Sequence, residues 1–410
     1  MPDSESRQRR PRAKPGEGRA SRDSLQMLRR QLPDEAACRR FLEEALWPDG
    51  RVCPHCGGVR SWPIHGKSAR PGLYECVECH LQFTVTTKTP LHATKLPLRV
   101  WIEAFWLMLW SSKGLSSVVL GRWLGLPQKT AWKVAHACRE LMHRHEEMAV
   151  ALTGIVEIDD KYVGGAPRYQ KGVKHKRGRG TSKPQVVIAA DRNGFVRAAP
   201  VSGDSAEHVG PFMRCYVDKN ADIMSDGADV YRKLGGEFRS HQAVHHGKKE
   251  FVRGNLHNNT SESFGAYLER VLVGVYHRLS KKHLHRYVSE ASFRWNAKWE
   301  TYGEEGDPLG ICDRIPPLHQ VRMLFQRAQG CQLRSTLRGG LRFPEDPDPG
   351  PKLWRARLAW AERQGPEAVE KVRAERMSAS PFDPLPSSRG RSERRPPRPA
   401  GHRNRIVIRD

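Results

Sequence analysis

The chain is poor in acidic residues and in apolar residues. Its 410 residues carry 70 Lys and Arg against 45 Asp and Glu, a formal net charge of +25. This balance excludes an acidic protein and predicts a polyanionic partner. Apolar residues make up 38% of the chain, below the roughly 45–50% of a typical globular protein. We therefore expect a folded middle and two ends that bury little.

The chain also lacks long apolar runs. Its most apolar window, residues 101–110, has about half the length that spans a bilayer and contains Glu103. Residues 1–23 are polar and rich in Arg, so we expect neither a secretory signal nor a membrane partner. Without export, the nine cysteines argue against a disulfide framework and favour metal binding or packing.

Composition and periodicity divide the chain into successive segments. The ends cannot bury enough apolar surface to fold, so we predict a disordered basic arm at 1–23 and a disordered Arg/Pro-rich tail at 378–410. Between them we predict the following segments: short helices at 24–46, a cysteine module at 47–89, a helical region at 97–148, a mixed strand and helix block at 154–300, and a partly helical extension at 301–377 with helices near 316–328 and 351–376.

The cysteine module contains two C-x-x-C pairs, Cys53-Pro-His-Cys56 and Cys76-Val-Glu-Cys79, separated by a loop of about twenty residues. This spacing is typical of a structural zinc site with four thiolate ligands. Unrelated free cysteines and a redox pair are the weaker alternatives, because two neighbouring pairs favour a shared ion. We do not expect His55, His65 or His80 to bind it. Zinc should supply much of the folding energy of this zinc ribbon.

The helical region reads as a helix, a turn at Gly125-Leu126-Pro127 and a second helix, over residues 116–142. This is the pattern of a helix-turn-helix, whose second helix can enter the major groove of DNA. Gln128, Lys129 and Lys133 are then the candidates that face the groove. A plain helical hairpin is the alternative. Earlier in the region, four aromatic residues at helical spacing are predicted to be core: Trp101, Phe105, Trp106 and Trp110.

The mixed block places acids at the ends of predicted elements. A strand at 154–159 ends in Asp159, a hairpin turns at Asn193-Gly194, a helix covers 205–217, and a strand at 221–226 ends in Asp226. A further strand near 238–244 precedes a helix with Glu262 in its first turn and Asn258-Asn259-Thr260 as N-cap residues. This order matches a ribonuclease-H-like α/β core.

Three carboxylates brought together in such a core suit phosphodiester chemistry. Two divalent metal ions held by Asp159, Asp226 and Glu262 can activate an attacking oxygen and stabilise the leaving one. Hard oxygen ligands favour Mg²⁺ or Mn²⁺. Taken singly, each acid also has a structural explanation, since Asp is common in turns and Glu in first helical turns. We expect turn or surface roles for the remaining acids of the block: Asp160, Asp191, Asp204, Asp218 and Asp222.

The motifs resemble those of the ISXO-like DDE insertion-sequence transposases with an N-terminal zinc ribbon. The resemblance covers about residues 30–300 and is carried by the following motifs: Trp47-Pro-Asp-Gly-Arg-Val-Cys-Pro-His-Cys-Gly-Gly, Val156-Glu-Ile-Asp-Asp-Lys-Tyr-Val-Gly-Gly, Ser225-Asp-Gly, His257-Asn-Asn-Thr-Ser-Glu and the stretch from Val275 to Asn296. It implies metal-dependent DNA cleavage and strand transfer at terminal inverted repeats. It further implies double-stranded DNA as partner, a homo-oligomer in the synaptic complex, and a bacterial cytoplasmic protein at the nucleoid.

The resemblance also assigns site residues. Asp159 and Asp226 match the first two catalytic acids, and Glu262 is the third, with Asn259 as the alternative. The family usually has Lys seven residues after that Glu, whereas this chain has Glu269. Arg270 is adjacent but about 100° around the helix. This departure leaves open a non-catalytic DNA-binding protein derived from a transposase, and a structure-selective nuclease of the same fold is a third possibility.

A basic loop at 168–183 is the remaining candidate for DNA contact. Its cations alternate with glycine, and they would contact phosphates without reading bases. A solvated loop is the equally weighted alternative. The candidate residues are Lys171, Lys174, Lys176, Arg177 and Arg179.

Overall fold

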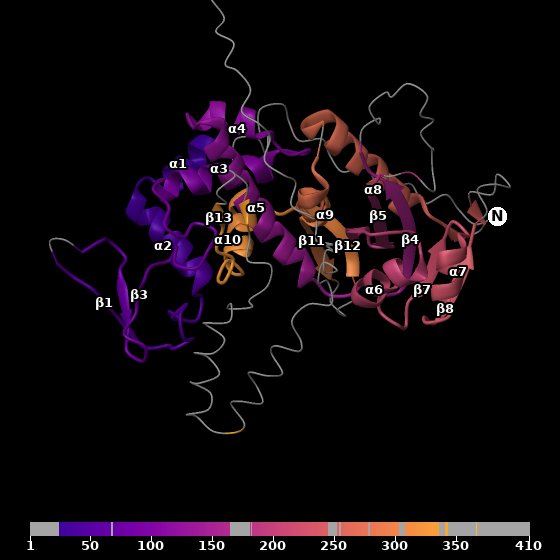
Figure 1. Ribbon diagram of the computed structural model, residues 1–410, viewed down its shortest axis with the longest axis horizontal. Helices are drawn as coiled ribbons and strands as arrows, with labels where there is room; N and C mark the ends of the chain where they lie inside the picture. Colours follow the sequence, from indigo (N-terminus) through magenta and orange to yellow (C-terminus); the bar gives the residue numbers. More distant parts are fainter. Residues whose placement is uncertain are drawn as a thin grey trace, which may run out of the picture. The chain divides into compact units, whose positions relative to one another are not determined.

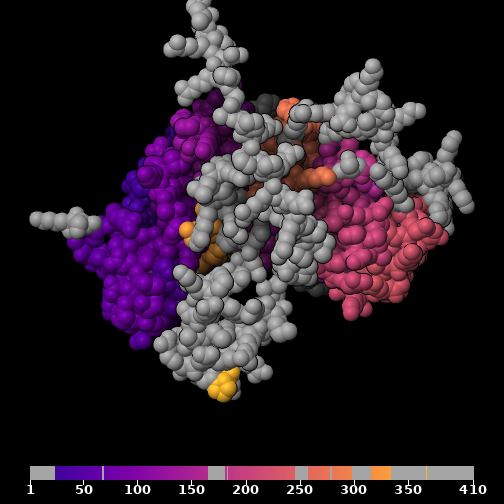
Figure 2. All heavy atoms as spheres, in the orientation of Figure 1, coloured from indigo at the N-terminus to yellow at the C-terminus, as the bar shows by residue number. Residues whose placement is uncertain are grey.

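The structure is a computed structural model, and its described residues are coloured in Figure 2. They are 24–66, 69–164, 181, 183–244, 252–253, 256–277, 279–302, 308–335, 341–342 and 366. All of them except Pro366 belong to one compact unit that ends at Glu345. The predicted arm at 1–23 and tail at 378–410 lie outside the described residues, and so does the predicted helix at 351–376 apart from Pro366.

A five-stranded mixed sheet forms the centre of the mixed block. Its order is β6-β5-β4-β7-β8, and its strands are β4 (Ile155–Tyr162), β5 (Gln185–Asp191), β6 (Val196–Val201), β7 (Asp222–Ser225) and β8 (Ser240–Ala243). β4, β5 and β6 pair antiparallel, whereas β7 and β8 run parallel to β4. The hairpin between β5 and β6 turns at the predicted Asn193-Gly194, where Gly194 has φ +83°. This arrangement confirms the ribonuclease-H-like fold class.

Helices cover both faces of this sheet (Figure 1). On one face, Val156 and Ile158 of β4 pack with α6 (Ala206–Tyr216) and α7 (Asp229–Gly235). On the other face, Ile188 packs with α8 (Asn259–Val271) and α9 (Leu284–Asn296). Because side chains alternate along a strand, Glu157, Asp159 and Lys161 face α8.

The N-terminal helices build a second core. α1 (Leu25–Gln31) and α2 (Glu35–Leu46) begin at Ser24 and Asp34, whose side chains accept hydrogen bonds from backbone N–H groups of the first turn. They pack against α3 (Leu98–Trp110) and α10 (Pro317–Phe325), which lies within the predicted helix at 316–328. Trp101, Phe105 and Trp106 are buried there, as predicted. Trp110 is 43% exposed and stacks on Trp106, so its predicted core position was wrong.

The helix-turn-helix pattern is present as α4 (Ser117–Leu124) and α5 (Gln128–Glu147). Gly125 between them has φ +64°, a left-handed conformation that ends α4. A Cβ atom at Gly121 would lie 2.8 Å from the carbonyl oxygen of Leu126, so the close approach of the turn to α4 requires glycine. The glycines at positions 121 and 125 therefore account for the tight turn between α4 and α5.

A buried ion cluster joins α5 to α9. The Arg139 Nε lies 2.8 Å from Glu290 Oε2, and Arg294 donates to Glu290 Oε1 at 2.5 Å. The Tyr276 hydroxyl donates to the same carboxylate at 2.9 Å. Removal of one partner would leave a buried charge, which costs about 3–5 kcal/mol in comparable sites. The cluster therefore couples the helix-turn-helix to the five-stranded sheet through packed helices.

The remaining described elements are short. β11 (Lys298–Tyr302) pairs antiparallel with β12 (Pro308–Arg314), and the π-helix η3 (Leu272–Tyr276) extends α8. No described helix is long and apolar enough to cross a membrane. The other elements are β9 (Val252–Arg253), β10 (Leu256–His257), the 3-10 helix η4 (Lys281–His283), β13 (Arg334–Ser335) and β14 (Leu341–Arg342).

The α5–α9 interface should weaken in acid because it buries histidine. Burial, with neighbouring cations, holds the pKa of His136 far below its usual value. The unfolded chain then binds a proton that the folded protein excludes, so stability falls as the pH drops below the unfolded histidine pKa. Between about pH 7.5 and pH 5, the free energy of unfolding should fall by about 2 kcal/mol less in His136→Gln than in the wild-type protein. Urea unfolding at both pH values measures this, with His80→Gln, an exposed ring, as the control. An unchanged pH dependence would contradict it.

Candidate active site and cysteine centre

The parallel register of β4 and β7 brings the first two predicted acids together. Ile158 pairs with Ser225, so Asp159 and Asp226 are the next residues along two neighbouring parallel strands. Asp226 directly follows the end of β7, and its Oδ1 accepts a hydrogen bond from the backbone N–H of Ala228 at 3.1 Å. Asp159 and Asp226 are therefore neighbours, although Asp159 lies within β4 and not at its end, where the sequence had placed it.

The third predicted acid, Glu262, lies in the first turn of α8 and contributes to the same electrostatic field. Burial is the main reason that the pKa of Asp159 is raised to about 7. The negative charges of Asp160, Asp226 and Glu262 raise it further. We call Asp159, Asp226 and Glu262 the acidic centre. Asp226 is half-buried and Glu262 is exposed, so the acidic centre is open to solvent. Asp159 precedes Asp226 by 67 residues and Glu262 by 103 residues, yet both charges act on its carboxyl group.

Asp160 and Tyr231 are members of this neighbourhood that sequence reasoning missed. Asp160 was expected in a turn or at the surface, but it lies within β4 on the face toward α7. The Tyr231 hydroxyl donates to Asp160 Oδ1 at 3.3 Å. Burial, followed by the charges of Asp160, Asp159 and Asp226, raises the pKa of Tyr231 far above its usual value. Tyr231 therefore stays neutral beneath the acidic centre, a role that only the packing of α7 reveals.

The start of α8 is held by a side chain from β4. Asn258 to Thr260 were expected to cap this helix, but within the described residues the Asn258 side chain makes no capping hydrogen bond. Instead the Glu157 carboxylate accepts from the backbone N–H groups of Thr260 at 2.7 Å and Ser261 at 3.0 Å. The prediction of an N-terminus at this point was right, whereas its source of capping was wrong. A carboxylate is well suited to a helix N-terminus because it faces unsatisfied N–H donors.

Asn258 connects the same turn to β7. It is 2% exposed. In the orientation that satisfies both of its amide atoms, its oxygen accepts from the backbone N–H of Asp226 at 3.2 Å and its nitrogen donates to the Met224 carbonyl at 3.3 Å. The first turn of α8 is therefore joined to both strands that carry predicted acids.

Glu269, which replaces the family's usual Lys, forms an ion pair. Its Oε2 lies 2.8 Å from Lys161 Nζ on β4. The Lys161 ammonium, with the charge of Lys183, lowers the pKa of Glu269. A cation is thus present beside α8, but it comes from the strand. Arg270 and Asn259 are exposed on α8.

The predicted DNA contacts of the helix-turn-helix lie at the start of α5. Gln128 and Lys129 are exposed, whereas Lys133 is half-buried. The Gln128 side chain donates to Ser117 Oγ at 3.0 Å, which ties it to α4. The basic loop candidates fall outside the described residues: Lys171, Lys174, Lys176, Arg177 and Arg179.

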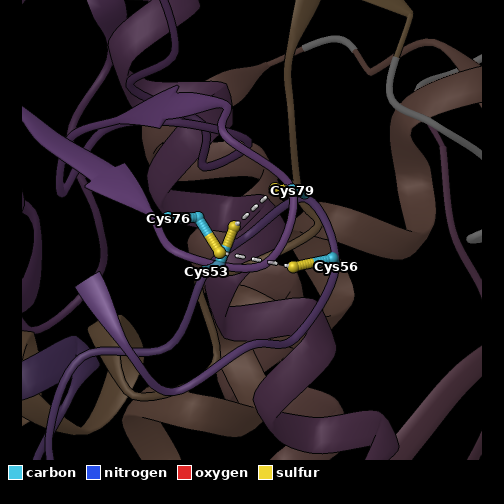
Figure 3. A group of neighbouring side chains, drawn as sticks. All are labelled: Cys53, Cys56, Cys76 and Cys79. Carbon is cyan, nitrogen blue, oxygen red and sulfur yellow. Dashed lines mark hydrogen bonds between the residues drawn. The ribbon is translucent and has the colours of Figure 1, made fainter.

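The four predicted cysteine ligands converge on one point (Figure 3). Their sulfur atoms all lie within 4.8 Å of one another. The Cys53 and Cys79 sulfurs are 3.7 Å apart, and the Cys56 and Cys76 sulfurs are 3.6 Å apart. Four sulfurs placed tetrahedrally at the usual zinc–sulfur distance are about 3.8 Å apart, so the cluster fits a zinc ion. His55 turns away, with its Nε2 3.2 Å from the Gln82 carbonyl oxygen.

The thiols need a cation to ionise together. Burial raises the pKa of Cys53 and Cys56. Cys76 is also buried, but hydrogen bonds from the backbone N–H groups of Cys79 and Glu78 lower its pKa. A bound divalent cation would offset the repulsion among the thiolates. The donor set therefore matches a metal rather than four free thiols.

The cysteine pairs are held by a small three-stranded sheet with β2 between β1 and β3. Its strands are β1 (Ser61–Pro63), β2 (Tyr74–Cys76) and β3 (Gln82–Phe83). Gly57, with φ +83°, forms the turn after the first pair. Trp47 packs edge-on against Phe83 at 5.9 Å between ring centroids, and both belong to the core shared with α2 and α3. The cysteine sheet is thus anchored on the N-terminal helices.

Comparison with known proteins gives two matching domains, one that includes the predicted acids and one that includes the four cysteines. Residues 151–296 match the ISXO2-like transposase domain, which contains the sheet and its acids. Residues 33–82 match the transposase zinc-ribbon domain, which contains the cysteine cluster. A stretch of 273 residues is 24% identical to the "Uncharacterized protein in transposable element ISH50" of Halobacterium salinarum, and it covers 63% of this chain and 90% of that protein. Two regions of the chain are thus similar to transposase domains, one to the transposase zinc-ribbon domain and one to the ISXO2-like transposase domain.

Proposed function

We propose that this transposase binds the terminal inverted repeats of an insertion sequence and catalyses metal-dependent DNA cleavage and strand transfer. Asp159, Asp226 and Glu262 are its catalytic acids. The observation that carries the proposal is the parallel register that makes Asp159 and Asp226 neighbours, within the region that matches the ISXO2-like transposase domain. We place the reaction in the cytoplasm at the nucleoid, where the DNA substrate is found.

The three acids have the donor chemistry that divalent metal ions require. Their donors are hard carboxylate oxygens, and their mutual repulsion is relieved when a cation binds. Asp159, Asp226 and Glu262 would hold Mg²⁺ or Mn²⁺, and the ions would stabilise negative charge on the phosphate oxygens during cleavage. The protein's own contribution is to hold the carboxylates in place on rigid elements. Glu262 is the preferred third ligand over Asn259 because it carries a charge that reaches Asp159.

DNA binding is the part of the proposal that explains the charge of the chain. A net charge of +25 favours contact with phosphates along the duplex. Gln128 and Lys129 are exposed at the start of α5 and are the candidates for base contact, with Lys133 as a supporting cation. Arg270 and Lys161 are candidates for phosphate contact beside the acidic centre, since one is exposed on α8 and the other faces it. Paired transposon ends would require a homo-oligomer.

Asp226→Asn tests the catalytic assignment. Loss of one charged ligand should lower Mg²⁺-dependent cleavage of a duplex that carries the element's terminal repeat by at least about a hundredfold. DNA binding, measured by gel shift, should be unchanged. Asp222→Asn at the start of the same strand, in an ion pair with Arg239, is the matched control and should cut normally. Equal binding without cleavage by wild type and variant would favour a non-catalytic DNA-binding protein. Cleavage of unmatched junctions without joining would favour a nuclease.

Cys79→Ser tests the zinc site. With one of four ligands lost, purified protein should hold far less than the roughly one zinc per chain expected of a closed four-thiolate site. Residues 47–89 should then become sensitive to limited proteolysis, because metal binding stabilises the ribbon. Metal analysis and peptide mapping measure both effects. Cys215→Ser, an exposed cysteine outside the cluster, should behave as wild type. Full zinc occupancy in the Cys79 variant would argue against the assignment.

Gln128→Ala tests sequence reading by α5. A side-chain amide that contacts a base edge should contribute about 1–3 kcal/mol of discrimination. We expect weaker binding to the terminal repeat and unchanged binding to random duplex, measured as the ratio of the two dissociation constants. Lys219→Ala, an exposed cation in a loop of the sheet domain, serves as the control. A loss that is equal on both duplexes would mean that Gln128 does not read sequence.

A further inference from the structure

We propose that Glu157 is a positioning residue of the acidic centre: by binding the first turn of α8, it sets the place of Glu262 relative to Asp159. This inference rests on the proposed function, because it matters only if Glu262 and Asp159 share metal ions. It assigns a role to a buried carboxylate that is not one of the three predicted metal ligands. Glu157 acts through α8.

The geometry makes Glu157 the shortest link between the two acids. Glu157 and Asp159 lie on the same face of β4, two residues apart, which is about 6.6 Å along a strand. The carboxylate of Glu157 binds the N–H of Ser261, the residue directly before Glu262. The Thr260 hydroxyl donates to the second oxygen of the same carboxylate at 3.2 Å. Glu157 therefore connects the strand that carries Asp159 to the residue that directly precedes Glu262.

The side chain of Glu157 is also held in a fixed position. Its side chain is fully buried. Arg192 Nη1 lies 2.8 Å from its Oε1, and the His257 ring nitrogen Nδ1 lies 3.3 Å from the same atom. Arg192, the Thr260 hydroxyl and the two α8 amides are hydrogen-bond donors, so both carboxylate oxygens are satisfied. A glutamine at this position would turn an NH₂ group toward one of these donors and weaken the anchor.

This anchor differs from the capping of the N-terminal helices. α1, α2 and α4 are capped by the residue that precedes each helix, Ser24, Asp34 and Ser116. Those caps stabilise a helix locally and do not determine where it sits. α8 is capped from β4 through Glu157 and joined to β7 through Asn258. Its first turn is therefore held against both acid-bearing strands, which is what a three-carboxylate centre requires.

The test uses full-length, zinc-loaded protein with Mn²⁺ as the probe. Glu157→Gln is compared with Glu146→Gln, a buried carboxylate that faces Arg197 and Asn296 away from α8. Hydrogen exchange of peptides covering 257–268 reports the α8 first turn, and calorimetric titration reports Mn²⁺ affinity. We expect Glu157→Gln to exchange faster in that peptide and to bind Mn²⁺ about tenfold more weakly, as is typical when a residue that orients a ligand is lost. Glu146→Gln should lower only the melting temperature.

Further variants distinguish a failure of this inference from a failure of the proposed function. Glu262→Gln should weaken Mn²⁺ binding without altering exchange of the α8 first turn, because it removes the ligand and leaves the anchor. Glu157→Asp keeps the charge but shortens the side chain, and it should show the same two effects if Glu157→Gln does not fold. Wild-type Mn²⁺ affinity or wild-type exchange in the Glu157 variants would overturn the inference alone. Absence of Mn²⁺ binding and cleavage in the wild-type protein would instead overturn the proposed function.

Discussion

The parallel pairing of β4 with β7 is the constraint on which the acidic centre depends. Parallel neighbours end at the same edge, so the residues that follow Ile158 and Ser225 are brought side by side. The connection between the strands passes through β5, β6 and α6, and the antiparallel hairpin fills the other side of β4. Buried apolar residues on both faces hold this register, because a slip of one residue would move Asp159 to the face of α6 and α7.

The placement of like charges at one point has to be balanced by the surroundings. On the α8 face of β4, Glu157 is paired with Arg192, and on the other face the Tyr231 hydroxyl donates to Asp160. Beside them, Lys161 faces α8 and pairs with Glu269. Burial and the charges of Asp160, Asp226 and Glu262 together raise the pKa of Asp159. The fold therefore gathers acidic residues around Asp159, within a chain that is otherwise strongly basic.

Sequence patterns located much of this arrangement. The strand order, both cysteine pairs, and the helices α4, α5 and α8 follow from local signals such as periodicity, glycine at turns and C-x-x-C spacing. The failures share one cause: they concern side chains whose surroundings are set by tertiary packing and not by neighbours in the sequence. Trp110 has helical spacing with core residues but faces solvent, and Asn258 has capping chemistry but points toward β7. The site roles of Asp159, Asp226 and Glu262 and the segment boundaries remain predictions.

The amino-acid sequence by itself determined which elements form and which residue types stand at their ends, because hydrophobic period, capping and turn preferences act over a few neighbours. Only the tertiary structure decided which of these ends meet. The contact between Glu157 and the first turn of α8 spans more than 100 residues, and the ion pair between Lys161 and Glu269 has a similar separation. Such contacts depend on strand register and helix docking, which are set by the packing of both sheet faces at once and leave no local pattern.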